Sequence, residues 1–62
     1  MNYGELAKLL KAAGWRLDRQ AKGSHEIWKK PGQTEQITVP NHGGKEVKPG
    51  LVKGIKRQAG IK

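Results

Sequence analysis

The spacing of apolar residues changes twice along this 62-residue chain, and that change limits the folds it can adopt. Near both ends the apolar residues recur every three or four positions, which is typical of a helix with one buried face. Between these segments, apolar and polar residues alternate in short runs separated by glycine and proline, which is typical of strands joined by turns. The sequence therefore predicts a helix, a set of strands and a second helix.

The first helix is expected to begin after Asn2 and to end at Gly14. Asn2 is a favourable N-cap, and Glu5 three residues later completes the pattern of a capping box. The apolar stripe of this helix consists of Tyr3, Leu6, Ala7, Leu10 and Ala13. Gly14 is a typical residue just past a helix end, from which Trp15 can fold back onto the helix.

Three strands are expected over residues 15–20, 24–30 and 34–39. The first two are separated by a glycine turn, and Pro31-Gly32 favours a type II turn before the third. An exposed polar loop is expected over residues 41–48.

Pro49 suits the first turn of the closing helix. Its apolar face consists of Leu51, Val52, Ile55 and Ala59. Gly54 either lowers helix stability by about 1 kcal/mol or marks close packing against the sheet. Together the elements predict an α+β fold of order α-β-β-β-α, a two-layer sandwich whose second sheet face stays open to solvent or a partner.

Length and composition narrow the possible functions. Residues 1–62 suffice for one small domain, which buries only about 60% of its unfolded surface and leaves little room for an enclosed small-molecule pocket. The absence of cysteine excludes disulfides, thiolate metal sites and cysteine nucleophiles, and fits a reducing cytoplasm. Neither a signal peptide nor a membrane-spanning segment is expected.

The chain is strongly basic. Thirteen Lys and Arg residues against five Asp and Glu give a formal net charge of +8, which favours nucleic acid as a partner, then an acidic protein, then a membrane surface. The segment Lys22-Gly23-Ser24-His25 places one histidine in a glycine turn at the start of a strand. Because an unperturbed histidine exchanges protons near neutral pH, this setting suggests acid–base chemistry on a polyanion. A surface histidine without a role is the simpler alternative.

Four segments, in this order, resemble the HicA family of bacterial and archaeal toxins, which are mRNA interferases. They are LLKAAGW at residues 9–15, KGSH at 22–25, ITVPNH at 37–42 and KRQAGI at 56–61. The resemblance implies a fold like that of the double-stranded RNA-binding domain and ribosome-independent mRNA cleavage in the cytoplasm, without a required metal or cofactor. It also implies a hetero-oligomer with a HicB-type antitoxin, as in type II toxin–antitoxin systems.

The resemblance assigns the catalytic role to His25. Where many relatives carry a second histidine or another residue directly after it, this chain has Glu26, so the acid–base partner of His25 stays open. RNA supplies its own nucleophile, the 2′-hydroxyl, so an enzyme need only move protons and stabilise phosphoryl charge. We interpret His25 as the general acid–base and Lys22 as a phosphate-binding residue. Ser24 either orients the substrate or caps the turn.

Other candidate residues have competing interpretations. His42 either shares the acid–base work or is a loop residue that touches RNA. The carboxylates of Asp18 and Glu26 are interpreted as balancing the charge of neighbouring lysines. The two histidines and the scattered carboxylates of the chain do not suggest a metal site. Strand parity places His25 and Ile27 on one face and Trp28 on the other. We expect Ile27 to face the helices, so that Trp28 stacks on an unpaired base or fills an antitoxin pocket, while the reverse arrangement makes Trp28 core.

Basic residues after the last strand form a possible phosphate track, although a solvated lysine face would look the same. They are Lys45, Lys48, Lys53, Lys56 and Arg57. Two other functions stay open beside the toxin. One is an RNA-binding module of this fold that does not cleave, and the other is an accessory protein that meets an acidic subunit.

Overall fold

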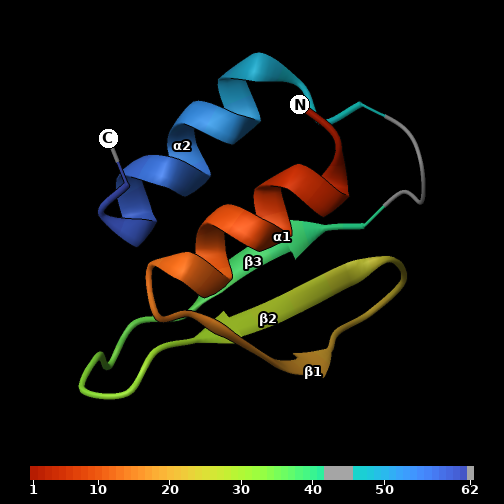
Figure 1. The fold of residues 1–62 in the computed structure, drawn as a ribbon. Helices are drawn as coiled ribbons and strands as arrows, with labels where there is room; N and C mark the ends of the chain where they lie inside the picture. The colour runs from red at the N-terminus through yellow and green to blue at the C-terminus, as the bar shows by residue number, and fades with distance from the viewer. Residues whose placement is uncertain (42–45, 62) are drawn as a thin grey trace.

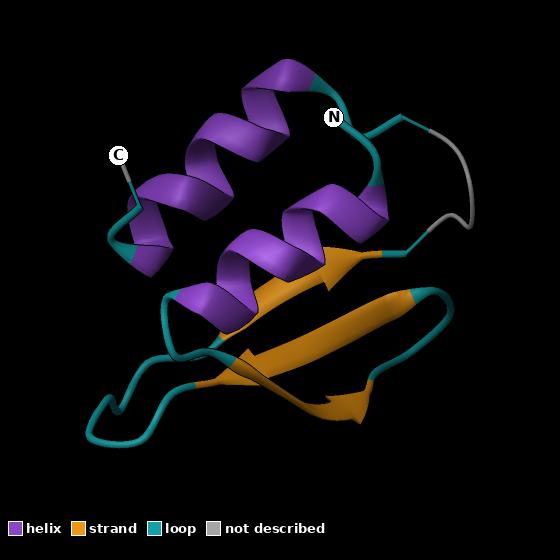
Figure 2. Cartoon of the chain, viewed as in Figure 1, coloured by secondary structure: helices purple, strands orange, loops and turns teal. Residues whose placement is uncertain are grey.

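The computed structural model describes residues 1–41 and 46–61, in which two helices lie on one face of a three-stranded antiparallel sheet (Figure 1). The elements follow the order α1 (Tyr3–Ala12), β1 (Arg16–Gln20), β2 (His25–Lys29), β3 (Ile37–Pro40) and α2 (Pro49–Ala59). The sheet order is β1-β2-β3, and both helices cover the same side of it (Figure 2). The expected α+β two-layer fold is confirmed.

Both helix ends of α1 form as the sequence predicts. The side chain of Asn2 accepts a hydrogen bond from the Glu5 amide at 2.9 Å, and the Glu5 carboxylate accepts one from the Asn2 amide at 3.1 Å. Gly14 adopts a φ of 95°, which a glycine reaches without steric cost. The amide of Trp15 then donates to the Leu10 carbonyl at 2.9 Å, so the chain folds back onto the helix.

Helix α2 begins at Pro49 and ends at Ala59, and it is followed by the capping residue Gly60, which has a φ of 75°. There the Ile61 amide donates to the Lys56 carbonyl at 2.8 Å, which repeats the ending of α1. A methyl group placed on Gly54 would meet no atom within 4 Å. Close packing against the sheet therefore does not explain this glycine.

The core lies between the helices and the covered face of the sheet. Its buried members are Leu6, Ala7, Leu10, Trp15, Trp28, Ile37, Val39, Val47, Val52, Ile55 and Ala59. The indole N–H of Trp15 donates to the Ala59 carbonyl at 3.2 Å and ties the start of the sheet to the end of α2. Val47 corrects the expectation of a fully exposed loop over residues 41–48, because it is 6% exposed and packs in this core.

The strands depart from expectation at both edges of the sheet. Strand β3 begins at Ile37 rather than at Thr34, and Pro40 is its last residue. Strand β1 has no buried residue, so the predicted alternation of buried and exposed positions is wrong there. Its pairing with β2 contains a bulge between Leu17 and Arg19, where Asp18 is the extra residue.

The expected facing of β2 is also wrong. Trp28 is 1% exposed and packs in the core between sheet and helices, opposite Ile37. Ile27 lies on the open face, where its partners are Arg19 and Thr38, and it is itself 6% exposed. The larger indole thus occupies the side that both helices enclose, where it removes more apolar surface from water.

Candidate functional site

His25 is placed by the turn that precedes β2. Gly23 has a φ of 68°, and the His25 amide approaches the Lys22 carbonyl at 3.5 Å across the turn. The Ala21 amide donates to the His25 carbonyl at 2.8 Å, which closes the β1–β2 hairpin. His25 is therefore the first residue of β2, and its side chain is exposed.

The open face of the sheet carries the His25 side chain. Directly paired residues of antiparallel strands point to the same side, so Pro40, the partner of His25, and Thr38, the partner of Ile27, share this face. The imidazole makes no hydrogen bond or ion pair within the described part of the chain.

Glu26, next to His25, points to the opposite face. Glu26 is 6% exposed, and its carboxylate accepts hydrogen bonds from the Tyr3 hydroxyl, from the Trp28 indole at 3.4 Å and from the Asn41 side-chain amide at 3.1 Å. Among the described residues, the donors to Glu26 are three uncharged groups and no lysine, contrary to the interpretation that it balances neighbouring lysines. Since it lies across the sheet, Glu26 does not exchange protons with His25.

The Glu26 cluster, defined as Glu26 with its donors Tyr3, Trp28 and Asn41, contains a tyrosine whose pKa is raised. Desolvation by burial, the hydrogen bond to Glu26 and the negative charge of that carboxylate together raise the pKa of Tyr3 to about 12. Asn41 also donates its backbone N–H to the Ser24 carbonyl at 2.8 Å. The residues on either side of His25 are thus both held by Asn41.

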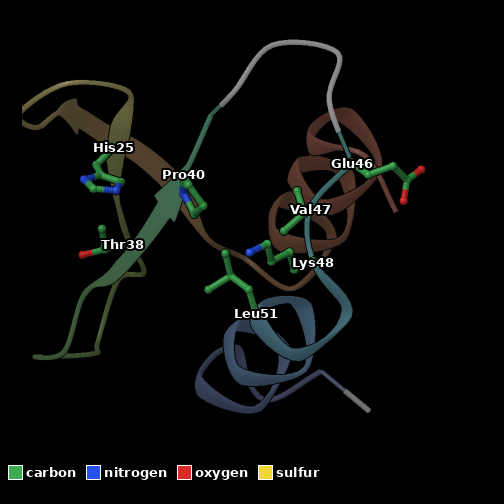
Figure 3. Close-up of a pocket in the computed structure, with 7 residues that line it drawn as sticks. All are labelled: His25, Thr38, Pro40, Glu46, Val47, Lys48 and Leu51. Carbon is green, nitrogen blue, oxygen red and sulfur yellow. The ribbon is translucent and has the colours of Figure 1, made fainter.

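A pocket of about 440 Å³ adjoins His25 (Figure 3). It is lined by His25, Thr38, Pro40, Glu46, Val47, Lys48 and Leu51. The Lys48 side chain is directed into the pocket and that of Glu46 away from it (Figure 3). The pocket thus combines an apolar wall of Pro40, Val47 and Leu51 with a polar rim of histidine, hydroxyl and ammonium groups.

The structure brings together only part of the predicted site. Lys48 lies in the His25 pocket, whereas Lys22 and Ser24 belong to the turn before His25. Trp28 is core, so neither base stacking nor an antitoxin contact is available to its ring.

Other predicted contacts fall elsewhere. Lys53 lines a different pocket, with Met1, Pro49, Gly50 and Val52. His42 and Lys45 lie outside the described residues. Among residues 1–41 and 46–61, no three His, Asp or Glu side chains form a group able to hold a metal ion. Neither described helix has the length and apolar character needed to cross a bilayer.

Three cations on the open face were missed from sequence. The pairing of β1 with β2 puts Arg16 and Arg19 on the same side as Lys29 and His25. Asp18 contacts Arg19 at 2.6 Å and Lys29 at 3.7 Å, so it balances neighbouring cations as expected. Had Trp28 rather than Ile27 been assigned to the helix side, alternation along β2 would have placed Lys29 on the open face. No pattern in the sequence predicts the bulge that turns Arg19 to this face.

Comparison with known proteins follows the whole chain. Residues 3–61 match a family model described as the HicA toxin of bacterial toxin–antitoxin systems. No curated protein gives a significant match. A solved chain from a "HicA3 and HicB3 toxin-antitoxin complex" is 38% identical and superposes with a TM-score of 0.81, over 100% of this chain and 97% of that one. The chain belongs to the HicA toxin family.

Proposed function

We propose that this chain is an endoribonuclease toxin that cleaves mRNA in the cytoplasm with His25 as its general acid–base. The observation that carries the proposal is the exposed imidazole at the head of β2, on a basic sheet face that the helices leave open. Catalysis on a long polyanion needs such an open face, because the substrate cannot enter an enclosed cavity. The cations Arg16, Arg19 and Lys29 supply attraction for the phosphate backbone there.

The chemistry requires only proton movement and charge stabilisation. His25 accepts the proton of the ribose 2′-hydroxyl as that oxygen attacks the adjacent phosphorus. The P–O5′ bond breaks, and the leaving oxygen takes up a proton from water, while His25 returns the proton that it accepted to solvent. The products are a 2′,3′-cyclic phosphate and a 5′-hydroxyl. Lys48, and Lys22 from the turn, stabilise the charge on the phosphoryl oxygens. No step calls for a metal.

A HicB-type antitoxin is the proposed protein partner. The similar solved chain belongs to a complex named for a HicA and a HicB protein, which supports this assignment. The net charge of +8 would speed association with an acidic antitoxin surface. Growth arrest by the isolated chain, relieved by co-expressed antitoxin, tests the partnership.

Cleavage of a defined RNA in EDTA tests the enzymatic proposal. We expect the native chain to cleave and His25→Ala to lose at least about a hundredfold in rate, a typical contribution of general acid–base catalysis. Because His25 is exposed, the variant should keep the native circular dichroism and melting temperature. Mapping of the product ends should give the cyclic phosphate.

Two results would contradict the proposal. Equal cleavage by His25→Ala would remove the catalytic role of His25. Tight, salt-sensitive binding with RNA left intact would show an RNA-binding module of the same fold instead.

A further inference from the structure

Leu51 is a large apolar side chain left exposed beside the proposed catalytic residue. It is 43% exposed and, among the described residues, shares that condition only with Met1 and Leu17. Single exposed leucines are ordinary on protein surfaces. Leu51, however, extends an apolar wall made by Pro40 and Val47, in the same pocket as His25. The wall therefore lies where substrate must lie if His25 is catalytic.

The polar rim of this pocket suits a nucleotide. Lys48 supplies a cation for a phosphate and Thr38 a hydroxyl that both donates and accepts hydrogen bonds, as a base edge requires. The acidic lining residue, Glu46, is directed away from the pocket (Figure 3). The volume of about 440 Å³ falls within the range of small-ligand sites, which are mostly apolar with a few polar groups.

Aromatic residues cannot provide the base-binding surface on this face. Proteins that bind single-stranded RNA commonly stack its bases on aromatic rings. The chain has three aromatic residues, and none is on the open face. Trp15 and Trp28 are core members, and Tyr3 packs against that core. The aliphatic wall of Pro40, Val47 and Leu51 is thus the apolar surface that lines the His25 pocket.

We propose that this pocket is a nucleobase subsite, which holds one unpaired base of the RNA adjoining the scissile phosphate. This inference rests on the proposed function. The base packs against Leu51, Pro40 and Val47, and Thr38 contacts its edge. Lys48 holds the attached phosphate, which keeps the reacting ribose beside His25.

The test combines altered protein with altered RNA. In an oligonucleotide with a mapped cleavage site, an abasic ribose replaces the nucleotide on either side of the scissile bond. For the native chain, we expect one of the two abasic substrates to lose about tenfold in kcat/KM, as a lost apolar contact in a binding pocket does. Leu51→Ala should lose about tenfold on intact RNA and nothing further on that abasic RNA. Leu17→Ala, which removes the other exposed leucine, is the matched control and should behave as the native chain.

A binding measurement keeps this test separate from the proposed function. Uncleavable 2′-O-methyl RNA, with and without the base, should show the same pattern in dissociation constants even if no RNA is cleaved. The subsite would be overturned if the loss caused by Leu51→Ala and the loss caused by the missing base multiplied when the variant was given abasic RNA, because the two changes would then act independently. It would also be overturned if Leu51→Ala left RNA cleavage and binding unchanged and weakened only antitoxin binding, because the wall would then be a protein contact.

Discussion

His25 and Glu26 are neighbours in β2 that point to opposite faces of the sheet. This placement exposes the His25 side chain and buries that of Glu26. Exposure places the His25 side chain at the surface, where the proposed function needs it. Burial lets the Glu26 carboxylate collect hydrogen bonds from α1, through Tyr3, and from Asn41 after β3. The strand that carries His25 is therefore fixed by contacts on its far side, which do not obstruct the ring.

The Tyr3–Glu26 hydrogen bond predicts a specific loss of stability at alkaline pH. The pKa of Tyr3 is about 12 in the folded chain against an ordinary value of 10, so ionisation favours the unfolded state. This contribution is complete below pH 10 and disappears as the pH rises to 12. Tyr3→Phe should lower the free energy of unfolding by about 1.5–3 kcal/mol at pH 8, the range for hydrogen bonds to charged groups. Urea unfolding from pH 8 to 12 should show the native chain converging on the variant above pH 10.

Comparing the native chain with Tyr3→Phe at each pH controls for the other groups that titrate between pH 8 and 12. Lysines deprotonate over the same range in both proteins, so their effect cancels in the difference. Parallel stability curves from pH 8 to 12 would contradict the role given to this hydrogen bond.

At the scale of helices and strands, the sequence correctly predicted the helix ends, because these are formed by interactions between residues close together in the chain. The capping box at Asn2 and the glycine endings at Gly14 and Gly60 are short-range devices, and the structure has all three. The facing of β2 depends on which of two adjacent apolar residues the helices enclose, a tertiary choice that alternation alone leaves open. The bulge at Asp18 and the burial of Val47 also depend on tertiary packing, so alternation in the sequence did not predict them.

For the candidate site, the sequence indicated the turn and His25 but not the pocket. Thr38 lies in the segment ITVPNH but was not predicted as a site residue, and Leu51 carries no motif. Both line the His25 pocket because β3 pairs with β2 and α2 packs against β3. Neighbours contributed by separate elements are set by long-range packing, which one sequence does not reveal.

Gly54 within α2 and Gly60 just after it should respond in opposite directions to the same substitution. A methyl group on Gly54 meets open space within a helix, so Gly54→Ala should raise the free energy of unfolding by about 0.5–1 kcal/mol. Gly60 holds a φ of 75°, so Gly60→Ala should lower it by about 1–2 kcal/mol through left-handed strain. Denaturant unfolding of both variants measures the difference. Changes of the same sign would contradict the conformation assigned to one of these positions.

At the scale of the whole molecule, basic residues that are alike in charge lie in different environments. Arg16, Arg19 and Lys29 share the open sheet face with His25, and Lys48 adjoins it through the pocket. Lys53 belongs instead to a pocket at the start of α2, with Met1 and Pro49. Under the proposed function, the net charge of +8 attracts RNA in general, and the fold decides which cations can contact its phosphates.

This division predicts unequal salt effects for two lysines that are equivalent in formal charge. For single-stranded RNA, each phosphate contact contributes about 0.7 to the slope of log affinity against log salt, because it releases condensed counterions. Lys48→Gln should therefore reduce the slope by about 0.7, and Lys53→Gln should leave it unchanged. Dissociation constants of uncleavable 2′-O-methyl RNA between about 50 and 200 mM salt measure both slopes. Equal slopes for the two variants would mean that overall charge, rather than the face beside His25, governs RNA binding.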